Sequence, residues 1–360
     1  MSKIFHLSIF GLAILFSYCY SILPSLDFDF SLRNNINDPI TPFIDAAPVF
    51  LFGNVVHVVL TRFMQYQPTL VELGLARVEL FRCFCLPTMI QQSKQNFIWI
   101  IQTDPNLDMT VLANMIALLQ PYPHFFLLAS NDNNHNFRRR VVNQSLVLSG
   151  NISLLEQATR LSKDHIFIET RLDADDGLNL GLLNHVEQVS VSRLSDPRRL
   201  NESRWLVFCI DRHFEWHNFG DSRDGALIFV AEAICVTPGL SFAMAPQTPR
   251  SSLPKGAHNL LVLKVSKCQA PNETACLYRM DQIEPVAALR ARTLTSAGMA
   301  NIGKSIMKHN TTDLFWSAVT LDLGIERRDV VKTKMYLDSR MVDIARENLE
   351  GQWCVCVFIE

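Results

Sequence analysis

The sequence has almost no net charge. Its 33 Lys and Arg residues nearly balance its 35 Asp and Glu residues, which gives a formal net charge of −2. The two signs are interspersed, and the one basic cluster, Arg138–Arg140, has a solvated loop as its simplest interpretation. A chain without a basic face lacks the electrostatic footprint of nucleic-acid binding. We therefore expect no nucleic-acid partner.

Two other patterns are missing. The doublets Cys83/Cys85 and Cys354/Cys356 are C-x-C rather than C-x-x-C, a spacing that argues against a zinc site. The chain also shows no internal repeat, which excludes a repeat architecture. With 360 residues, 48% of them hydrophobic, it is long enough for one large domain or two modest ones.

The remaining cysteines suggest disulfides. Cys19 lies in an N-terminal apolar run, and the other eight cysteines are an even number. Cys268 and Cys276 flank a short polar loop and are the best candidates for a bridge. Cys209 and Cys235 lie in apolar runs, so they either bridge neighbouring strands or remain buried thiols.

The N-terminus carries a targeting signal. Lys3 precedes an apolar stretch from Ile4 to Leu23, which Pro24 ends. A stretch of this length can span a bilayer as a helix. No clear A-x-A cleavage pattern follows, which favours an uncleaved signal anchor over residues 1–24 against a cleaved signal peptide. Residues 25–50, rich in Asp, Asn, Ser and Pro, are typical of a stem.

The expected location follows from that signal. We predict that the chain meets the membrane through its N-terminal helix, with the rest in the secretory lumen, in the Golgi membrane. Five sequons support this: Asn143, Asn151, Asn201, Asn272 and Asn310.

Strand and helix patterns alternate from residue 51 onward. This alternation predicts an α/β fold with a mixed, mostly parallel sheet flanked by helices. The expected strands are 55–60, 96–104, 124–129 and 166–172, and the expected helices are 70–83, 109–120 and 152–161. Pro87 is expected to end the first helix.

The pattern changes after residue 204. Closely spaced apolar runs at 205–210, 226–230 and 233–236 predict an added antiparallel sheet. Residues 313–349 are expected to be helical and 353–359 to form a strand-like end. The sequence therefore predicts a domain over 51–300 and a mostly helical extension over 301–360.

The most informative segment is an acidic turn, Asp173-Ala174-Asp175-Asp176-Gly177, directly after a predicted buried strand. Ligands of open α/β sheets bind beyond the carboxyl ends of the strands. Two Asp spaced i, i+2 can converge on one hard divalent cation. Such a cation neutralises a diphosphate leaving group. The turn therefore predicts metal-assisted transfer from a nucleotide-activated donor.

Other interpretations of this turn can be compared by spacing. An ordinary polar turn is disfavoured because three crowded carboxylates repel one another unless they are neutralised. An EF-hand needs Gly at its sixth position and Glu at its twelfth, but Gly177 is fifth and Asn184 is twelfth. Dehalogenase-like phosphatases place Thr or Val where Gly177 stands. Arg171 either pairs with a phosphate of the donor or, as favoured for an interior arginine, organises the acidic turn.

Several motifs occur in a characteristic order. They are Thr61-Arg62-Phe63, 84–88 with Gln91-Gln92, 96–99 leading to Asp104, 170–177 and 292–299. Together they resemble the putative rhamnosyltransferase family of GT-A-like glycosyltransferases, over residues 55–299.

The resemblance implies a GT-A-like fold, a nucleotide-sugar donor, Mn²⁺ or Mg²⁺, and a glycan or glycoconjugate acceptor. It makes Asp175 the principal metal ligand, and Asp173 a metal or donor-ribose ligand. Asp176 would lie behind the metal or face the donor sugar. Arg62 and Asp104 would lie on the donor side, Asp104 near the nucleoside.

The late metal ligand of such a site is also predicted from the resemblance. GT-A enzymes often add a histidine to the metal, and His258 is the best-placed residue for this role. A surface histidine is the alternative.

A catalytic base is harder to name. Asp221 and Asp224 lie between two predicted strands and are candidates for deprotonating the acceptor hydroxyl. A hairpin turn explains the same residues. Phe214, Trp216 and His217 either stack on a sugar or belong to the core.

Three functions remain open from the sequence. The first is a metal-dependent glycosyltransferase. The second is a luminal protein that binds cations or glycans without turnover. The third is a metal-dependent phosphatase. Fold alone does not decide among them.

Overall fold

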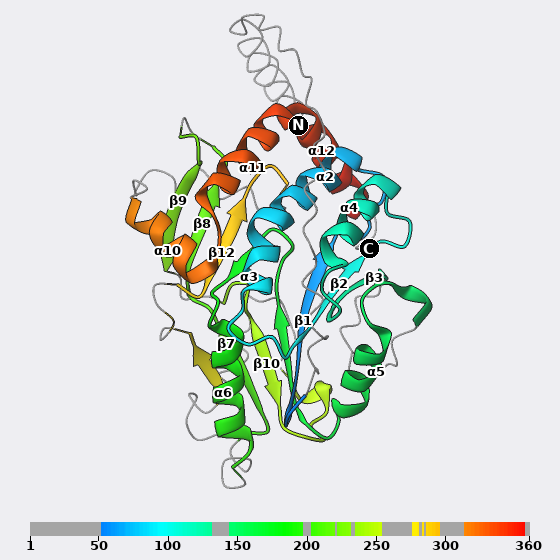
Figure 1. The fold of residues 1–360 in the computed structure, drawn as a ribbon, viewed down its shortest axis with the longest axis vertical. Coiled ribbons are helices and arrows are strands. Elements are labelled where there is room, and N and C mark those ends of the chain that lie inside the picture. Colours follow the sequence, from blue (N-terminus) through cyan, green and yellow to red (C-terminus); the bar gives the residue numbers. More distant parts are fainter. Residues whose placement is uncertain are drawn as a thin grey trace, which may run out of the picture. The chain divides into compact units, whose positions relative to one another are not determined.

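The computed structural model describes residues 52–131, 144–196, 203–219, 222–231, 235–253, 276–280, 283, 286–295 and 313–356 (Figure 1). Its contacts divide the chain into residues 1–49 and 50–360, and every described residue belongs to the second unit. The predicted anchor and stem lie outside the described residues. Within the described ranges no helix is long and apolar enough to cross a membrane.

The main sheet has eight strands in the order β11-β7-β10-β5-β1-β2-β3-β4. Strand β1 pairs in parallel with both β2 and β5, and β2 pairs in parallel with β3, while β10 runs antiparallel between β5 and β7. The strands are β1 (Val55–Phe63), β2 (Ile98–Thr103), β3 (Phe125–Ala129), β4 (Val147–Ser149), β5 (Ile166–Arg171), β7 (Trp205–Cys209), β10 (Ser241–Met244) and β11 (Leu277–Arg279). The expected α/β fold with a mixed sheet is confirmed.

Strand β1 shows why the first expected strand forms. Its residues alternate between two apolar clusters, with Val55, Val59 and Phe63 in one and Val56 and Val58 in the other. A central strand buried on both faces is a continuous apolar run, which is the pattern that the sequence shows.

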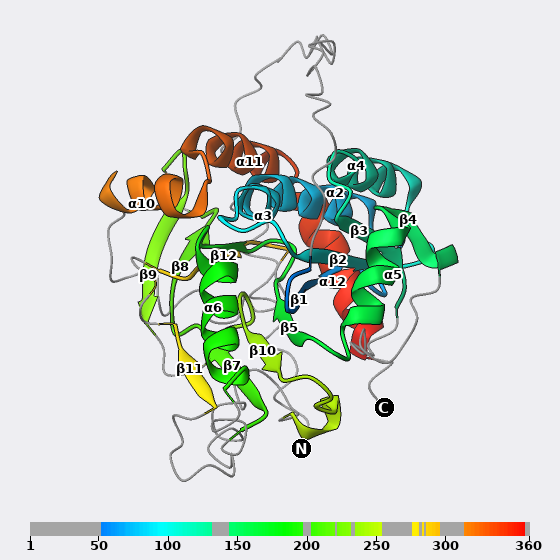
Figure 2. The same cartoon turned by 60° about the horizontal axis from the view of Figure 1, so that its bottom comes forward.

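Helices cover this sheet. They are α2 (Val71–Leu80), α4 (Met109–Leu119), α5 (Ile152–Leu161) and α6 (Leu182–Leu194). Asp108 begins α4 by accepting hydrogen bonds from the N–H groups of Thr110 and Val111. Helix α2 packs against α4, and Figure 2 shows the two helices side by side. The three expected helices are therefore present.

The first helix does not stop at Pro87. A π-helical turn, Phe81–Cys85, follows α2, and α3 (Leu86–Ile90) continues from it with Pro87 in its first turn. Proline lacks an N–H and clashes with the carbonyl four residues earlier. A widened π turn and a helix start both avoid that conflict, so the expected stop is wrong.

A second sheet has four strands in the order β6-β12-β8-β9. They are β6 (Gly177–Leu178), β12 (Ala288–Arg292), β8 (Arg212–His217) and β9 (Ala226–Ala231). The expected added sheet exists, but 205–209 belongs to the main sheet as β7, and β8 was not predicted. Of the expected strand 233–236, Cys235 and Val236 lie outside any strand, and the earlier residues lie outside the described ranges.

The C-terminal region is helical, as predicted up to residue 349. Helices α10 (Asp313–Leu323), α11 (Arg327–Ser339) and α12 (Met341–Cys356) follow one another, and α11 and α12 both pack on α2. Glu347 caps α2 by accepting a hydrogen bond from the Leu73 N–H at 2.9 Å. The strand expected at 353–359 is wrong for 353–356, because no proline interrupts the helix that begins at Met341.

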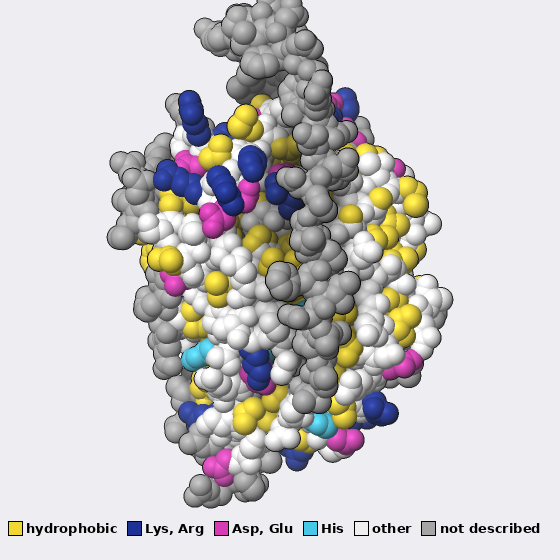
Figure 3. Space-filling model, viewed as in Figure 1, with side chains coloured by type: hydrophobic (Ala, Val, Ile, Leu, Met, Phe, Trp, Pro, Cys, Tyr) yellow, Lys and Arg dark blue, Asp and Glu magenta, His cyan; other side chains and the backbone are white. Residues whose placement is uncertain are grey.

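Charged side chains of both signs gather near these helices. Figure 3 shows them at the upper end of the view, over α11. The ion pairs there include Arg340–Glu72 and Lys332–Asp329. Such exposed pairs are interspersed charges on a solvated surface and carry little stability.

The structure decides between the two alternatives left open for Cys209 and Cys235. Cys209 and Cys235 are bonded, with their Cα atoms 5.0 Å apart. Cys276 is also disulfide-bonded, while its expected partner Cys268 lies outside the described residues. Cys83 and Cys85 are buried free thiols.

Candidate functional site

The candidate site lies where three parallel strands end. Residues of β1 and β2 are in register up to Phe63 and Thr103, and Leu60 of β1 is opposite Arg171 of β5. The chain therefore delivers Arg62, Asp104 and the acidic turn to the same edge of the main sheet. The sequence-based expectation that ligands bind at this edge rests on the same geometry.

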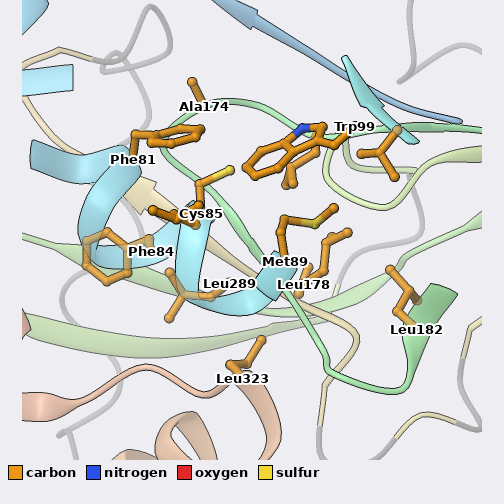
Figure 4. Close-up of a cluster of buried hydrophobic side chains, with 14 of the residues drawn as sticks. Phe81, Phe84, Cys85, Met89, Trp99, Ala174, Leu178, Leu182, Leu289 and Leu323 are labelled. Carbon is orange, nitrogen blue, oxygen red and sulfur yellow. The ribbon is translucent and has the colours of Figure 1, made fainter. Parts of the chain in front are cut away.

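The acidic turn rests on the hydrophobic core. Ala174 is buried, and Figure 4 shows it close to Phe81 and Cys85 of the π-helical turn. The Cys85 thiol lies 3.7 Å from the carbonyl oxygen of Asp173. A Cβ atom on Gly177 would lie 2.9 Å from Thr88 Cγ2 and 3.0 Å from the Phe84 carbonyl oxygen, which explains why glycine ends the turn.

The three carboxylates of the turn have different surroundings. The Asp176 N–H donates to the Asp173 carbonyl at 3.1 Å, which closes the turn. Asp173 is exposed and Asp175 is half-buried, whereas Asp176 is buried. The Asp176 Oδ1 accepts a hydrogen bond from the Ala291 N–H at 3.0 Å. Asp173 is therefore open to solvent, Asp175 is partly so, and Asp176 holds β12.

The repulsion expected within the turn is present. Desolvation by the surrounding protein and the charge of Asp175 raise the pKa of Asp173 to about 6. The positive charges of Arg290, Arg62 and Arg292 act in the opposite direction. The Asp173 side chain is nevertheless exposed to solvent.

The buried member of the turn is affected more strongly. Burial and the two neighbouring carboxylates, Asp175 and Asp173, raise the pKa of Asp176 well above its usual value. Arg290 and Arg292 oppose that rise. The carboxylates of the turn therefore repel one another in spite of the nearby arginines, and a bound cation would relieve that repulsion.

Arg77 is a site residue that the sequence reasoning missed. Burial lowers the pKa of its guanidinium and the charge of Asp175 opposes this, which places the two side chains in each other's field. Arg77 donates to Gln67 Oε1 at 2.6 Å and to the Thr295 carbonyl at 3.1 Å. One arginine on α2 therefore joins two loops beside the acidic turn. No sequence signal distinguishes it from other helix arginines.

Asp104 organises the loop between β1 and α2. It is buried, and its carboxylate accepts hydrogen bonds from the Tyr66 N–H at 3.2 Å, the Asn106 N–H at 2.8 Å and Asn131 Nδ2 at 2.6 Å. Met64 and Tyr66 have φ angles of 51° and 61°. Non-glycine residues in the left-handed region are strained, and such strain gathers at functional sites.

The donor set fits a hard cation that a substrate completes. Mg²⁺ in proteins is typically held by one or two carboxylates together with substrate phosphates and water. Asp173 and Asp175 supply two such carboxylates, while the Asp176 carboxylate is occupied by Ala291. Among the described residues no group of three or more His, Cys, Asp or Glu side chains forms a metal site by itself. His258 lies outside the described residues.

The other predicted residues have distinct surroundings. The Arg171 guanidinium lies 5.4 Å from the ring centre of Phe242. The Asp224 carboxylate pairs with Arg327 at 2.5 Å and accepts a hydrogen bond from Ser222. Desolvation of this buried carboxylate acts to raise its pKa. The hydrogen bonds from Ser222 and Arg327 outweigh that effect, so the pKa of Asp224 lies below its usual value. A carboxylate of lowered pKa is a weak base, which favours a structural role.

The remaining residues of that region are also placed. Asp221, the second base candidate, lies outside the described residues. Phe214 and Trp216 are buried in the core, which agrees with the core interpretation rather than with sugar stacking.

The comparison with known proteins supports the resemblance. Residues 62–204 match the family described as putative rhamnosyl transferase. No curated protein matches the chain. The family match confirms the resemblance read from the motifs, and it covers Arg62, Asp104 and the whole acidic turn.

Proposed function

We propose, from the membership of residues 62–204 in a glycosyltransferase family, that the protein transfers a sugar from a nucleotide-sugar donor to an acceptor hydroxyl. The acceptor is a glycan or glycoconjugate, and a divalent cation binds at Asp173 and Asp175. One observation carries this proposal. At the carboxyl edge of the sheet, Asp173 is exposed and Asp175 is half-buried, and the third carboxylate of the turn, Asp176, anchors it through Ala291.

The reaction exchanges one bond for another. The bond between the anomeric carbon and the diphosphate oxygen breaks, and its electron pair stays on the diphosphate. The acceptor oxygen bonds to the anomeric carbon and loses its proton to a base, for which Asp221 is the remaining candidate of the predicted pair Asp224 and Asp221. Bound Mn²⁺ or Mg²⁺ would supply positive charge to the leaving diphosphate.

The residues of this chain hold that arrangement in place. Asp173 and Asp175 would bind the cation, and Asp176 fixes the turn against β12. Arg77 fixes the two neighbouring loops. Because these contacts fix the side chains before the reaction, little reorganisation of the site is needed during sugar transfer.

The nucleoside end of the donor is assigned to the β1–α2 loop. Tyr66 is 48% exposed, although Asp104 holds its backbone rigidly. An exposed aromatic ring on a strained, anchored loop is suited to stack on a nucleobase. Arg62, at the end of β1, lies between this loop and Asp173. Rhamnose, from the family description, is the first donor sugar to test.

The location proposed is the secretory lumen, with residues 1–24 as the anchor in a Golgi membrane. The Cys209–Cys235 bond and the bonded Cys276 support it, because disulfides persist mainly in oxidising compartments.

The test is nucleotide release by the full chain, produced in a secretory host. A panel of nucleotide sugars is offered with Mn²⁺, with Mg²⁺ and with chelator, in the presence of candidate acceptors. We expect release from one donor class, only with metal. Asp175→Asn should reduce it by more than about 100-fold, since even indirect partners of a metal cost about 10–100-fold.

The matched control is Asp211→Asn. Asp211 pairs with Arg279 on β11 and is not part of the acidic turn. This variant should keep full activity. Metal binding without release from any donor would favour the binding-protein function, and phosphate release from a monoester would favour the phosphatase.

A further inference from the structure

The second sheet carries a charged face beside the acidic turn. His213, Glu215 and His217 alternate along β8, so their side chains share one face. In the register with β12, Arg290 is opposite Glu215 and Arg292 is opposite His217. On the other face of β8, Phe214 and Trp216 enter the core, where the Trp216 ring is tilted against Phe84 with ring centres 4.8 Å apart. The sequence reasoning did not predict this strand.

Glu215 lies at the centre of this face. Its Oε1 is 3.4 Å from Arg290 Nη1, 3.2 Å from Arg292 Nε and 3.5 Å from His213 Nε2. Its Oε2 is 3.6 Å from His217 Nε2. We name these five residues the β8–β12 cluster. One carboxylate faces two guanidinium groups, so the arginines and Glu215 together carry one positive charge in excess.

The cluster is buried but its hydrogen bonding is incomplete. The histidine side chains are 0% and 1% exposed, and the two arginine side chains are 14% and 22% exposed. Neither ring nitrogen of His217 has a hydrogen-bond partner among the described residues. Each arginine uses one nitrogen on Glu215 among the described contacts, and a guanidinium has five N–H donors. Because both arginine side chains are partly exposed, their remaining donors are accessible to water or to a ligand.

The cluster adjoins the acidic turn. Ala291, between the two arginines, donates its N–H to Asp176 at 3.0 Å. The charges of both arginines also oppose the rise in the pKa values of Asp173 and Asp176, so these charges act on the turn directly. A ligand that contacts both the acidic turn and the β8–β12 cluster must interact with the cation at the turn and with the guanidinium groups of the cluster.

We propose that Arg290 and Arg292 bind the diphosphate of the donor, and that Glu215 is the positioning residue that aims their guanidinium groups. This inference rests on the proposed function. Arginine matches phosphate oxygens with paired N–H donors. A cation balances Asp173 and Asp175, which leaves the net positive charge of the cluster for the diphosphate. The same two arginines would stabilise the negative charge that forms as the sugar leaves.

The experiment measures binding rather than turnover. Uridine, thymidine and guanosine diphosphates and their nucleosides are titrated calorimetrically into the full chain with Mn²⁺. The variants are Arg290→Gln and Arg292→Gln, with Arg279→Gln as matched control, because Arg279 pairs with Asp211 on β11. We expect each test variant to bind the diphosphate at least about 10-fold more weakly, as the loss of a charged hydrogen bond predicts. Nucleoside binding should be unchanged, and the control should match wild type.

Glu215→Gln tests the positioning role. If Glu215 only balanced charge, its removal would tighten diphosphate binding. As a positioning residue its removal should weaken that binding by about 3-fold or more, with the nucleoside unaffected. Arg290→Lys and Arg292→Lys keep the positive charge and should bind the diphosphate more tightly than the glutamine variants do. They also provide a second pair of variants if a glutamine variant fails to fold.

The outcomes are distinguishable. Wild-type binding of a diphosphate that the arginine variants retain would overturn this inference and leave the proposed function intact. Absence of binding of all three diphosphates to wild type would overturn both. Variants that lose acceptor affinity but keep diphosphate affinity would assign the cluster to an acidic acceptor instead, and would also overturn the inference.

Discussion

The two sheets each bury histidines among polar partners, but they do so in opposite ways. In the main sheet His57 Nε2 lies 2.8 Å from Thr170 Oγ1, which lies 2.7 Å from Ser241 Oγ. This chain of neutral groups crosses β1, β5 and β10 and contains no ion. Short hydrogen bonds between neutral groups satisfy the buried Nε2 and hydroxyl atoms at low cost, and His57 Nδ1 is the one ring nitrogen of this network without a hydrogen-bond partner among the described residues.

The β8–β12 cluster has the opposite character. Its contacts are 3.2–3.6 Å long and involve charged side chains, and neither ring nitrogen of His217 has a hydrogen-bond partner within the part of the chain that the structure describes. Burial of charge is costly unless every group is paired. The comparison teaches that the first network serves the fold, whereas the second retains capacity for a ligand.

The largest expected effect concerns pH and the main-sheet chain. Burial, and secondarily the charge of Lys94, lower the pKa of His57 to about 3, whereas an unfolded histidine titrates near 6.5. The fold therefore favours the neutral ring. The resulting stability is complete above pH 6.5 and is lost as pH falls from 6.5 towards 3. The slope is about 1.4 kcal/mol per pH unit, or about 3 kcal/mol between pH 6.5 and 4.5.

Urea unfolding of wild type and His57→Gln at several pH values tests this expectation. The variant should lose stability less steeply as pH falls. The control His165→Gln, whose ring Nδ1 lies 3.1 Å from the Leu161 carbonyl oxygen of α5, should keep the wild-type slope. Equal slopes for wild type and His57→Gln would show that His57 is not held neutral by the fold.

The second prediction breaks the neutral chain without changing charge. Thr170→Val removes the hydroxyl between His57 and Ser241 and should lower the free energy of unfolding by about 2 kcal/mol. Diphosphate affinity should not change, because the chain contributes no group to the ligand. Thr159→Val, on the partly exposed α5 helix, is the control and should change stability by less than about 0.5 kcal/mol. A Thr170→Val variant with normal stability and altered diphosphate affinity would erase the contrast between the sheets.

The smallest expected effect separates structure from chemistry at Asp224. Its ion pair with Arg327 joins the β8–β9 turn to α11, and Arg327 is about half exposed. Asp224→Asn should therefore cost about 1 kcal/mol of stability and reduce the turnover number by less than about 10-fold. A general base would instead contribute about 10²–10⁴-fold. Turnover and urea unfolding of the same preparation distinguish these roles, and a loss of 100-fold with normal stability would restore Asp224 as the base.

Much of the main sheet could be predicted because local pattern and tertiary position agree there. The apolar run of β1 is buried on both faces, and the acidic turn follows β5 as the pattern indicates. The second sheet was harder, because β8 alternates polar and apolar side chains with histidine and glutamate on its buried polar face. A strand whose polar side is buried has no distinct sequence signature.

Pro87 and Trp353 show the limits of local rules. Proline was expected to end the first helix, but the π-helical turn before it removes the conflict. The apolar end at 353–356 suits a strand or a helix equally, and the helix started at Met341 decides in favour of helix. Short apolar runs cannot be assigned by periodicity alone.

The sequence by itself determined the alternation of strands and helices, the acidic turn and the family motifs, because these depend on residues near one another in the chain. The tertiary structure alone decided which carboxylate of the turn faces inward, which arginines reach it and which cysteines join. Arg77, Glu215 and Arg292 lie far apart in sequence and act near one turn only after the sheets form. Charge and burial depend on distance in space, and the order of residues does not state that distance.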